Sequence, residues 1–124
     1  MKQVKILLIF LAIPIFSFAQ DFNVGEQTIN YFDNSRNRQI KAEIWYPTFE
    51  IDSLLQRRTD LPFQLPPTIR DAKLIEESFP LIVISHGTGG NRFSLAWLAI
   101  ELTKSGYIVV APDHWGNTYD NKIP

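Results

Sequence analysis

The residues best suited to chemistry lie in one short segment, 84–92, which reads ISHGTGGNR. Its three glycines allow positive φ angles and a close approach of the backbone to a bound group. The segment follows an apolar run and precedes a helical pattern, so free N–H groups at the helix start could stabilise negative charge. In open α/β sheets, ligands bind at the carboxyl ends of the strands, which is where this segment is expected to lie. Such a loop could serve as a phosphate cradle or as an oxyanion hole.

The glycine spacing argues against a phosphate cradle. A dinucleotide-binding loop that began at Gly87 would need a glycine at position 92, which is Arg92. No Lys-Ser or Lys-Thr pair follows at the spacing of a P-loop either. The remaining chemistry is acyl transfer, in which a backbone N–H after His86-Gly87 stabilises the tetrahedral intermediate.

The elements around this segment predict a strand–loop–helix–strand unit. Residues 81–84 and 107–111 are continuous apolar runs, as expected for parallel strands that are covered on both faces. Residues 91–105 carry an amphipathic helical stripe, with Asn91 as its expected N-cap. At its other end, Lys104 suits the helix dipole and Gly106 suits the C′ position.

Two earlier strands are expected to form an antiparallel hairpin over residues 27–33 and 39–46, ended by Pro47. In the second strand, apolar residues at the even positions alternate with Lys41, Glu43 and Trp45 at the odd positions. The polar segment 34–38 is the expected turn.

Residues 48–79 are interpreted as a proline-rich insertion, because five of the eight prolines lie in the stretch from Pro47 to Pro80, with these two included. Two short helical patterns are predicted within it. One covers residues 51–58, and the other starts at Thr68 with Asp71 as a capping partner. The insertion is either a solvated connector or a lid over a substrate site.

Composition excludes several classes of protein. The chain has 124 residues, no cysteine and a net charge of −1, so it forms one domain at most. The lack of cysteine excludes a disulfide scaffold, a cysteine nucleophile and a thiolate zinc site. A pI of about 6.1 argues against a nucleic-acid partner. His86 and His114 have no metal-ligand spacing around them, so neither a metal nor another cofactor is expected.

Residues 1–19 are expected to be a secretory signal peptide. Lys2 and Lys5 precede the apolar run 6–16, and the residues before the expected cleavage point after Ala19 are small at −3 and −1. The protein is therefore expected to be exported to the periplasm or the extracellular space, with no stable membrane anchor after cleavage.

The sequence resembles the α/β-hydrolases, and within them the dienelactone hydrolase-like proteins and the platelet-activating factor acetylhydrolases. The resemblance covers residues 25–47 and 79–121. It rests on the segments FPLIVISHGTGG (79–90), LAWLA (95–99), SGY (105–107), VVAPDH (109–114) and IWYP (44–47). Secreted polyester hydrolases of the cutinase-like type are similar as well, but the His-Gly pair favours the esterase group.

The resemblance implies an α/β fold class: residues 20–124 would be the N-terminal part of an α/β-hydrolase domain, with a hairpin followed by a βαβ unit of a mostly parallel sheet. It implies that the backbone N–H of Thr88 forms half of the oxyanion hole, while His86 and Gly87 shape the loop. His86 is not expected to be the catalytic base, since the base of this family lies much later in the chain. Asp113 is expected to cap the turn that follows it, and Arg92 to be solvated.

One departure from the family pattern is important. None of the seven serines lies in Gly-x-Ser-x-Gly, and the triad order of serine, acid and histidine would place all three downstream. The chain is therefore interpreted as the front part of a hydrolase that acts on short-acyl or lipid-like esters and is inactive alone. The alternatives are a polyester hydrolase, a non-catalytic secreted binding protein and a truncated product.

Residues 20–124 alone are expected not to fold cooperatively, because parallel strands need cover on both faces. Substrate identity and oligomeric state are not encoded in a recognisable pattern.

Overall fold

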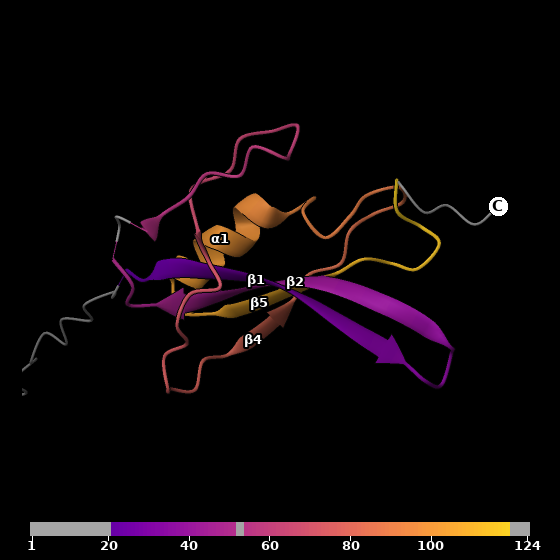
Figure 1. Ribbon diagram of the computed structural model, residues 1–124, viewed down its shortest axis with the longest axis horizontal. Helices are drawn as coiled ribbons and strands as arrows, with labels where there is room; N and C mark the ends of the chain where they lie inside the picture. Colours follow the sequence, from indigo (N-terminus) through magenta and orange to yellow (C-terminus); the bar gives the residue numbers. More distant parts are fainter. Residues whose placement is uncertain (1–20, 52–53, 120–124) are drawn as a thin grey trace, which may run out of the picture.

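A computed structural model describes residues 21–51 and 54–119 (Figure 1). The predicted signal peptide lies outside these residues. The chain forms a five-stranded mixed sheet with the strand order β3-β1-β2-β5-β4, and one helix lies against it. The elements are β1 (Asn23–Asp33), β2 (Arg38–Thr48), β3 (Ile69–Arg70), β4 (Leu81–Val83), α1 (Ala96–Lys104) and β5 (Ile108–Pro112). No helix within the described ranges is long and apolar enough to cross a membrane.

The predicted hairpin is confirmed, and its strands are longer than expected. β1 and β2 pair antiparallel along their whole length, from Asn23 opposite Thr48 to Asp33 opposite Arg38. Pro47 does not end β2, as predicted, but lies inside it opposite Val24. It is tolerated because β5 pairs only with residues 42–45, which leaves β2 with one neighbour at this point.

The βαβ unit is also confirmed. β4 and β5 are parallel, with Leu81 opposite Ile108, and α1 connects them. The helix begins at Ala96 rather than at Asn91, whose side-chain oxygen accepts the Phe93 N–H in a preceding turn. Gly106 has a φ of +89° at the end of the helix, which is the conformation that its predicted C′ position requires.

The core fills the space between α1 and one face of the sheet. Trp45 of β2 lies edge-on to Phe93, with ring centroids 6.4 Å apart, although its place in the strand pattern had suggested an outward position. The buried residues of this cluster are Val24, Trp45, Leu65, Phe93, Ala96, Ala99, Ile100, Val109 and Ala111. Because β2 is a central strand, both of its faces contain buried residues.

The opposite face of the sheet is less covered at its β4 edge. On this face β4 is open to solvent in the described residues, since Leu81 is 61% and Val83 65% exposed. Ile82, between them, packs against the core under α1. β4 is also the last strand of the sheet, so one side of its backbone has no neighbouring strand among the residues described.

The insertion, residues 48–79, is attached to both faces of the sheet around its β1 edge. Leu65 is buried in the core under α1, while Ile69 and Ala72 pack with Tyr46 on the other face. The Tyr46 hydroxyl donates a hydrogen bond of 2.8 Å to the Ala72 carbonyl. The interpretation of this segment as a merely solvated connector is therefore wrong, and whether it acts as a lid stays a prediction.

Neither helical pattern of the insertion forms an α-helix in the described residues. Thr68 does not start a helix: its backbone pairs with that of Gln56, and β3 follows it as a short strand parallel to β1. Asp71 has a φ of +52° and donates its N–H to the Glu26 carbonyl. Only Leu54 has a short 3₁₀ conformation in the first pattern, of which residues 52–53 lie outside the described ranges. Pairing with the sheet edge outweighs the weak local helical preference.

Candidate active-site loop

The His-Gly loop, defined here as residues 85–92, connects β4 to the turns before α1. Its backbone folds back on itself, with the Gly90 N–H donating to the Gly87 carbonyl at 3.0 Å. Gly89 has a φ of +72°, in the left-handed region that favours glycine. A Cβ atom on Gly90 would lie 3.1 Å from the His86 Cβ and 3.2 Å from the Gly87 carbonyl oxygen. Two of the three glycines are therefore required by the loop geometry.

The loop is also tied to the segment that follows β5, which runs beside it in Figure 1. The Gly89 N–H donates to the backbone oxygen of Asn117 at 3.3 Å and to its side-chain oxygen at 3.4 Å. Hence the amides of Gly89 and Gly90 are both committed to contacts within the protein.

The amide of Thr88 differs from those of its two neighbours. Thr88 is exposed, and its N–H makes no hydrogen bond to any part of the chain that the structure describes. It therefore has a backbone donor available to a group from solvent, at the carboxyl end of a parallel strand, where α/β sheets bind ligands. Its role as an oxyanion donor stays a prediction at this point.

His86 is held by backbone atoms on both sides of its ring. Its Nδ1 lies 2.8 Å from the Gly87 carbonyl, and its Nε2 accepts the His114 N–H at 3.0 Å. The first contact needs a proton on Nδ1 and the second needs a lone pair on Nε2, so the two bonds together fix one neutral tautomer. Both nitrogens are therefore engaged within the protein, and the loop-shaping role expected of His86 and Gly87 stays a prediction.

His114 lies against the same loop. Its ring stacks on that of His86 with centroids 4.1 Å apart, and its Nε2 lies 3.0 Å from the Ser85 Oγ. These contacts bring together the first residues after β4 and β5. No group of three or more His, Cys, Asp or Glu residues within the described ranges could hold a metal ion.

The far end of the loop is anchored by Arg92, which is only 17% exposed in its side chain. The expectation of a solvated arginine is wrong. Asp113 accepts the backbone N–H of Arg92 at 2.7 Å and its guanidinium at 2.8 Å. Asp113 thus caps the turn at Arg92, in an earlier segment, rather than the turn that follows Asp113 itself.

Arg92 also reaches a buried charge cluster that the sequence did not reveal. Its Nε lies 3.2 Å from the carboxylate of Glu43, which is buried on β2. Glu43 accepts further hydrogen bonds from the Thr28 hydroxyl at 2.8 Å and from Arg70 at 2.5 Å. Burial raises the pKa of Glu43, while the hydrogen bonds from Thr28 and Arg70 oppose that rise.

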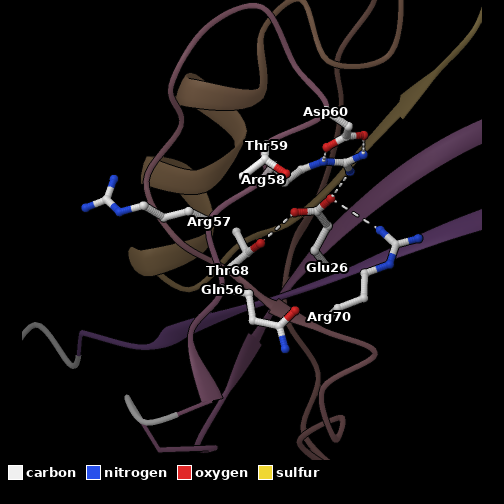
Figure 2. A pocket seen from close by; sticks show the side chains of 8 residues that line it. All are labelled: Glu26, Gln56, Arg57, Arg58, Thr59, Asp60, Thr68 and Arg70. Atoms are coloured by element: carbon white, nitrogen blue, oxygen red, sulfur yellow. Dashed lines mark hydrogen bonds and ion pairs between the residues drawn. The ribbon is translucent and has the colours of Figure 1, made fainter.

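A second buried carboxylate, Glu26, continues the cluster toward the insertion. Figure 2 shows Glu26 between two arginines, with Arg58 at 2.5 Å and Arg70 at 3.2 Å, and with the Thr68 hydroxyl at 2.6 Å. A cavity of about 360 Å³ opens beside these side chains. Arg58 also pairs with Asp60, and this contact lowers the pKa of the Asp60 carboxyl.

The sequence contained one hint of this buried charge cluster, but the hint was too weak to predict it. Glu26, Glu43 and the arginines at positions 58, 70 and 92 are far apart in sequence, and each one alone resembles an ordinary surface charge. Only the pairing of β1 with β2 puts the two glutamates on the face that α1 covers. The position of Trp45 two residues after Glu43 was the local hint that this side of β2 is buried.

The strand order and the loop after β4 define a class of protein. The structure matches that of a ferulic acid esterase from Streptomyces cinnamoneus, with a TM-score of 0.66 and 24% sequence identity over 78% of this chain. The fold is therefore the N-terminal portion of an α/β-hydrolase-like fold. The match spans 35% of the length of that esterase.

A family model gives the more specific assignment. The model of platelet-activating factor acetylhydrolase, isoform II, matches residues 31–119. This range includes most of the hairpin, the insertion, the His-Gly loop and the βαβ unit. The chain belongs to this family of esterases, as the resemblance of its motifs had predicted.

Proposed function

We propose that the complete protein is an exported carboxylic-ester hydrolase, and that this chain supplies half of its oxyanion hole. The observation that carries the proposal is the Thr88 amide. It is exposed and without a hydrogen bond to the described residues, while the next two amides are held inside the protein. A fixed N–H of this kind stabilises the negative oxygen of a tetrahedral intermediate without reorganising during the reaction.

The serine nucleophile, the acid and the base would come from further parts of the complete enzyme. The match to 35% of the esterase chain supports this view, as does the uncovered side of β4. We propose that another strand pairs with the open edge of β4 and that further helices cover Leu81 and Val83. In that arrangement the nucleophile would follow a strand adjacent to the His-Gly loop, and the present chain alone would be inactive.

The expected substrates are small-molecule or lipid esters with short acyl groups. The family of this chain supports this class, because an acetylhydrolase removes an acetyl group. In the reaction, the serine Oγ attacks the ester carbonyl, its proton passes to the histidine base, and the Thr88 N–H binds the carbonyl oxygen as it becomes negative. The alkoxide then leaves with that proton, and water releases the acyl group by the reverse sequence.

The proposal is tested on the complete protein with p-nitrophenyl acetate, butyrate and palmitate, and with a p-nitrophenyl phosphonate that modifies active serines. We expect hydrolysis of the short esters and stoichiometric inactivation by the phosphonate. If the protein instead prefers the palmitate ester or an insoluble polyester, the proposed class of short-acyl substrates is wrong. If the protein neither hydrolyses an ester nor reacts with the phosphonate, the proposed activity is wrong, and a non-catalytic binding protein would take its place.

A further inference from the structure

The His-Gly loop and the insertion are connected to the same buried carboxylate. On the loop side, Arg92 donates its Nε to Glu43 at 3.2 Å, while its backbone and Nη1 are held by Asp113. Arg92 is four residues from Thr88. A shift of its guanidinium would therefore be transmitted through a short, hydrogen-bonded stretch of backbone to the candidate oxyanion donor.

On the insertion side, Arg70 and Arg58 approach the same place. Arg70 donates Nη1 to Glu43 at 2.5 Å and to Glu26 at 3.2 Å, and Arg58 donates to Glu26 at 2.5 Å (Figure 2). Glu43 is fully buried on the central strand β2, so it is a fixed point between the arginine of the loop and those of the insertion. Its carboxylate accepts from Thr28 as well, which orients it on the sheet.

An aromatic contact forms a second link between the two segments. The guanidinium carbons of Arg58 and Arg92 lie 4.2 Å and 4.4 Å from the centre of the Phe93 ring. Phe93 itself is buried under α1. One arginine from the insertion and one from the loop therefore contact the same ring, and both also lie near Glu43, with Arg58 at 3.9 Å and Arg92 at 3.2 Å from its carboxylate.

We propose that Glu43 is a positioning residue for the reaction, which holds the His-Gly loop through Arg92 and couples it to the insertion through Arg70. This inference rests on the proposed function, because that function is what assigns the loop to catalysis. It has the consequence that a contact made on the insertion changes the position of the Thr88 amide.

Stability alone is a poor reason for this arrangement. Two buried carboxylates and three arginines carry a large desolvation cost, and well-packed apolar residues often stabilise a protein as much as a buried ion pair does. A network of directional charged hydrogen bonds, in contrast, fixes geometry within narrow limits. Small displacements of a group near the reacting atoms lower the reaction rate strongly. We therefore expect the cluster to act by holding the loop in its reactive geometry.

The test uses Glu43→Gln in the complete protein, with Asp33→Asn as the matched control. Asp33 is also a carboxylate with two arginine partners, but it lies at the turn end of the hairpin. For Glu43→Gln we expect kcat with p-nitrophenyl acetate to fall by about 10- to 100-fold, with KM changed by less than about threefold. The control is expected to keep the wild-type kcat.

Hydrogen exchange separates positioning from loss of folding. In Glu43→Gln, the amides of Gly89 and Gly90 should exchange at least about 10-fold faster, while those of α1 exchange at the wild-type rate. Arg70→Gln should accelerate the same loop amides, although among the described residues the Arg70 side chain donates only to Glu26, Glu43 and Thr28 and to none of the loop. If Glu43→Gln does not fold, Arg92→Lys provides a milder break, for which the same loop-specific acceleration is expected.

The outcomes that overturn the proposal are specific. An unchanged kcat, unchanged exchange in the loop, or equal acceleration in the loop and α1 would each reduce Glu43 to an ordinary structural residue. If Arg70→Gln leaves the loop unchanged, the coupling to the insertion is wrong. If the wild-type protein hydrolyses no ester, the proposed function fails, but the exchange measurements still decide whether the loop and the insertion are coupled.

Discussion

Leu65→Ala tests whether the proline-rich insertion is part of the folded core. Leu65 is 6% exposed and packs in the cluster of Val24, Trp45 and Phe93, between α1 and the sheet. Truncation of a buried leucine to alanine costs about 2–5 kcal/mol, composed of lost transfer free energy and the cavity left behind. Because Leu65 comes from an irregular segment that can partly collapse, we expect a loss in the lower part of this range, about 2–3 kcal/mol.

Leu74→Ala is the matched control, since Leu74 belongs to the same insertion and is 62% exposed. The same chemical change there should cost less than about 1 kcal/mol. The assay is urea unfolding of the complete protein, followed by tryptophan fluorescence, with the midpoint compared at an unchanged m value. If the two variants are equally stable, the insertion does not contribute to the core and the packing described above is wrong.

Two further predictions concern the hairpin. Gly25→Ala should destabilise the protein by about 1–3 kcal/mol in the same assay, because a Cβ at Gly25 would overlap the Tyr46 ring, which the hydrogen bond from its hydroxyl to the Ala72 carbonyl holds in place. Unaltered stability would show that Tyr46 can move aside. Hydrogen bonds from Ser35 and two arginines lower the pKa of Asp33 from 3.8 to about 2, so its carboxylate stabilises the fold above pH 3.8 and this contribution is lost as the pH falls through about 2. Asp33→Asn lacks that contribution, so its stability difference from the wild type should shrink between about pH 5 and about pH 2, and a constant difference would refute the assignment.

The parts of the fold that depend on local patterns were predictable from the sequence. The hairpin follows from alternation on either side of a polar turn, and the βαβ unit follows from two apolar runs around a helical stripe. Gly106 ends the helix as its position indicated, because a positive φ is a local requirement. These signals are contained within about 10 to 15 residues each.

The parts that depend on distant partners were not predictable. Glu43 had a polar place in an alternating strand, and its burial is possible only because Arg70 and Arg92 come from segments far along the chain. The pattern at Thr68 favoured a helix, but the free edge of β1 bound the segment as a strand instead. Arg92 was expected in solvent for the same reason, since its acceptor Asp113 follows another strand.

The Thr88 amide offers the most direct test of the account. Thr88→Pro removes this N–H, and Thr88→Ala retains it while removing the side chain. Thr88 is not among the residues with positive φ, so a left-handed backbone does not exclude proline at this position. In the complete protein, with p-nitrophenyl acetate as substrate and circular dichroism as the check on folding, kcat should fall by about 10²- to 10³-fold for Thr88→Pro and stay within about threefold of wild type for Thr88→Ala. A folded Thr88→Pro variant with wild-type kcat would contradict the claim that this loop supplies the oxyanion hole.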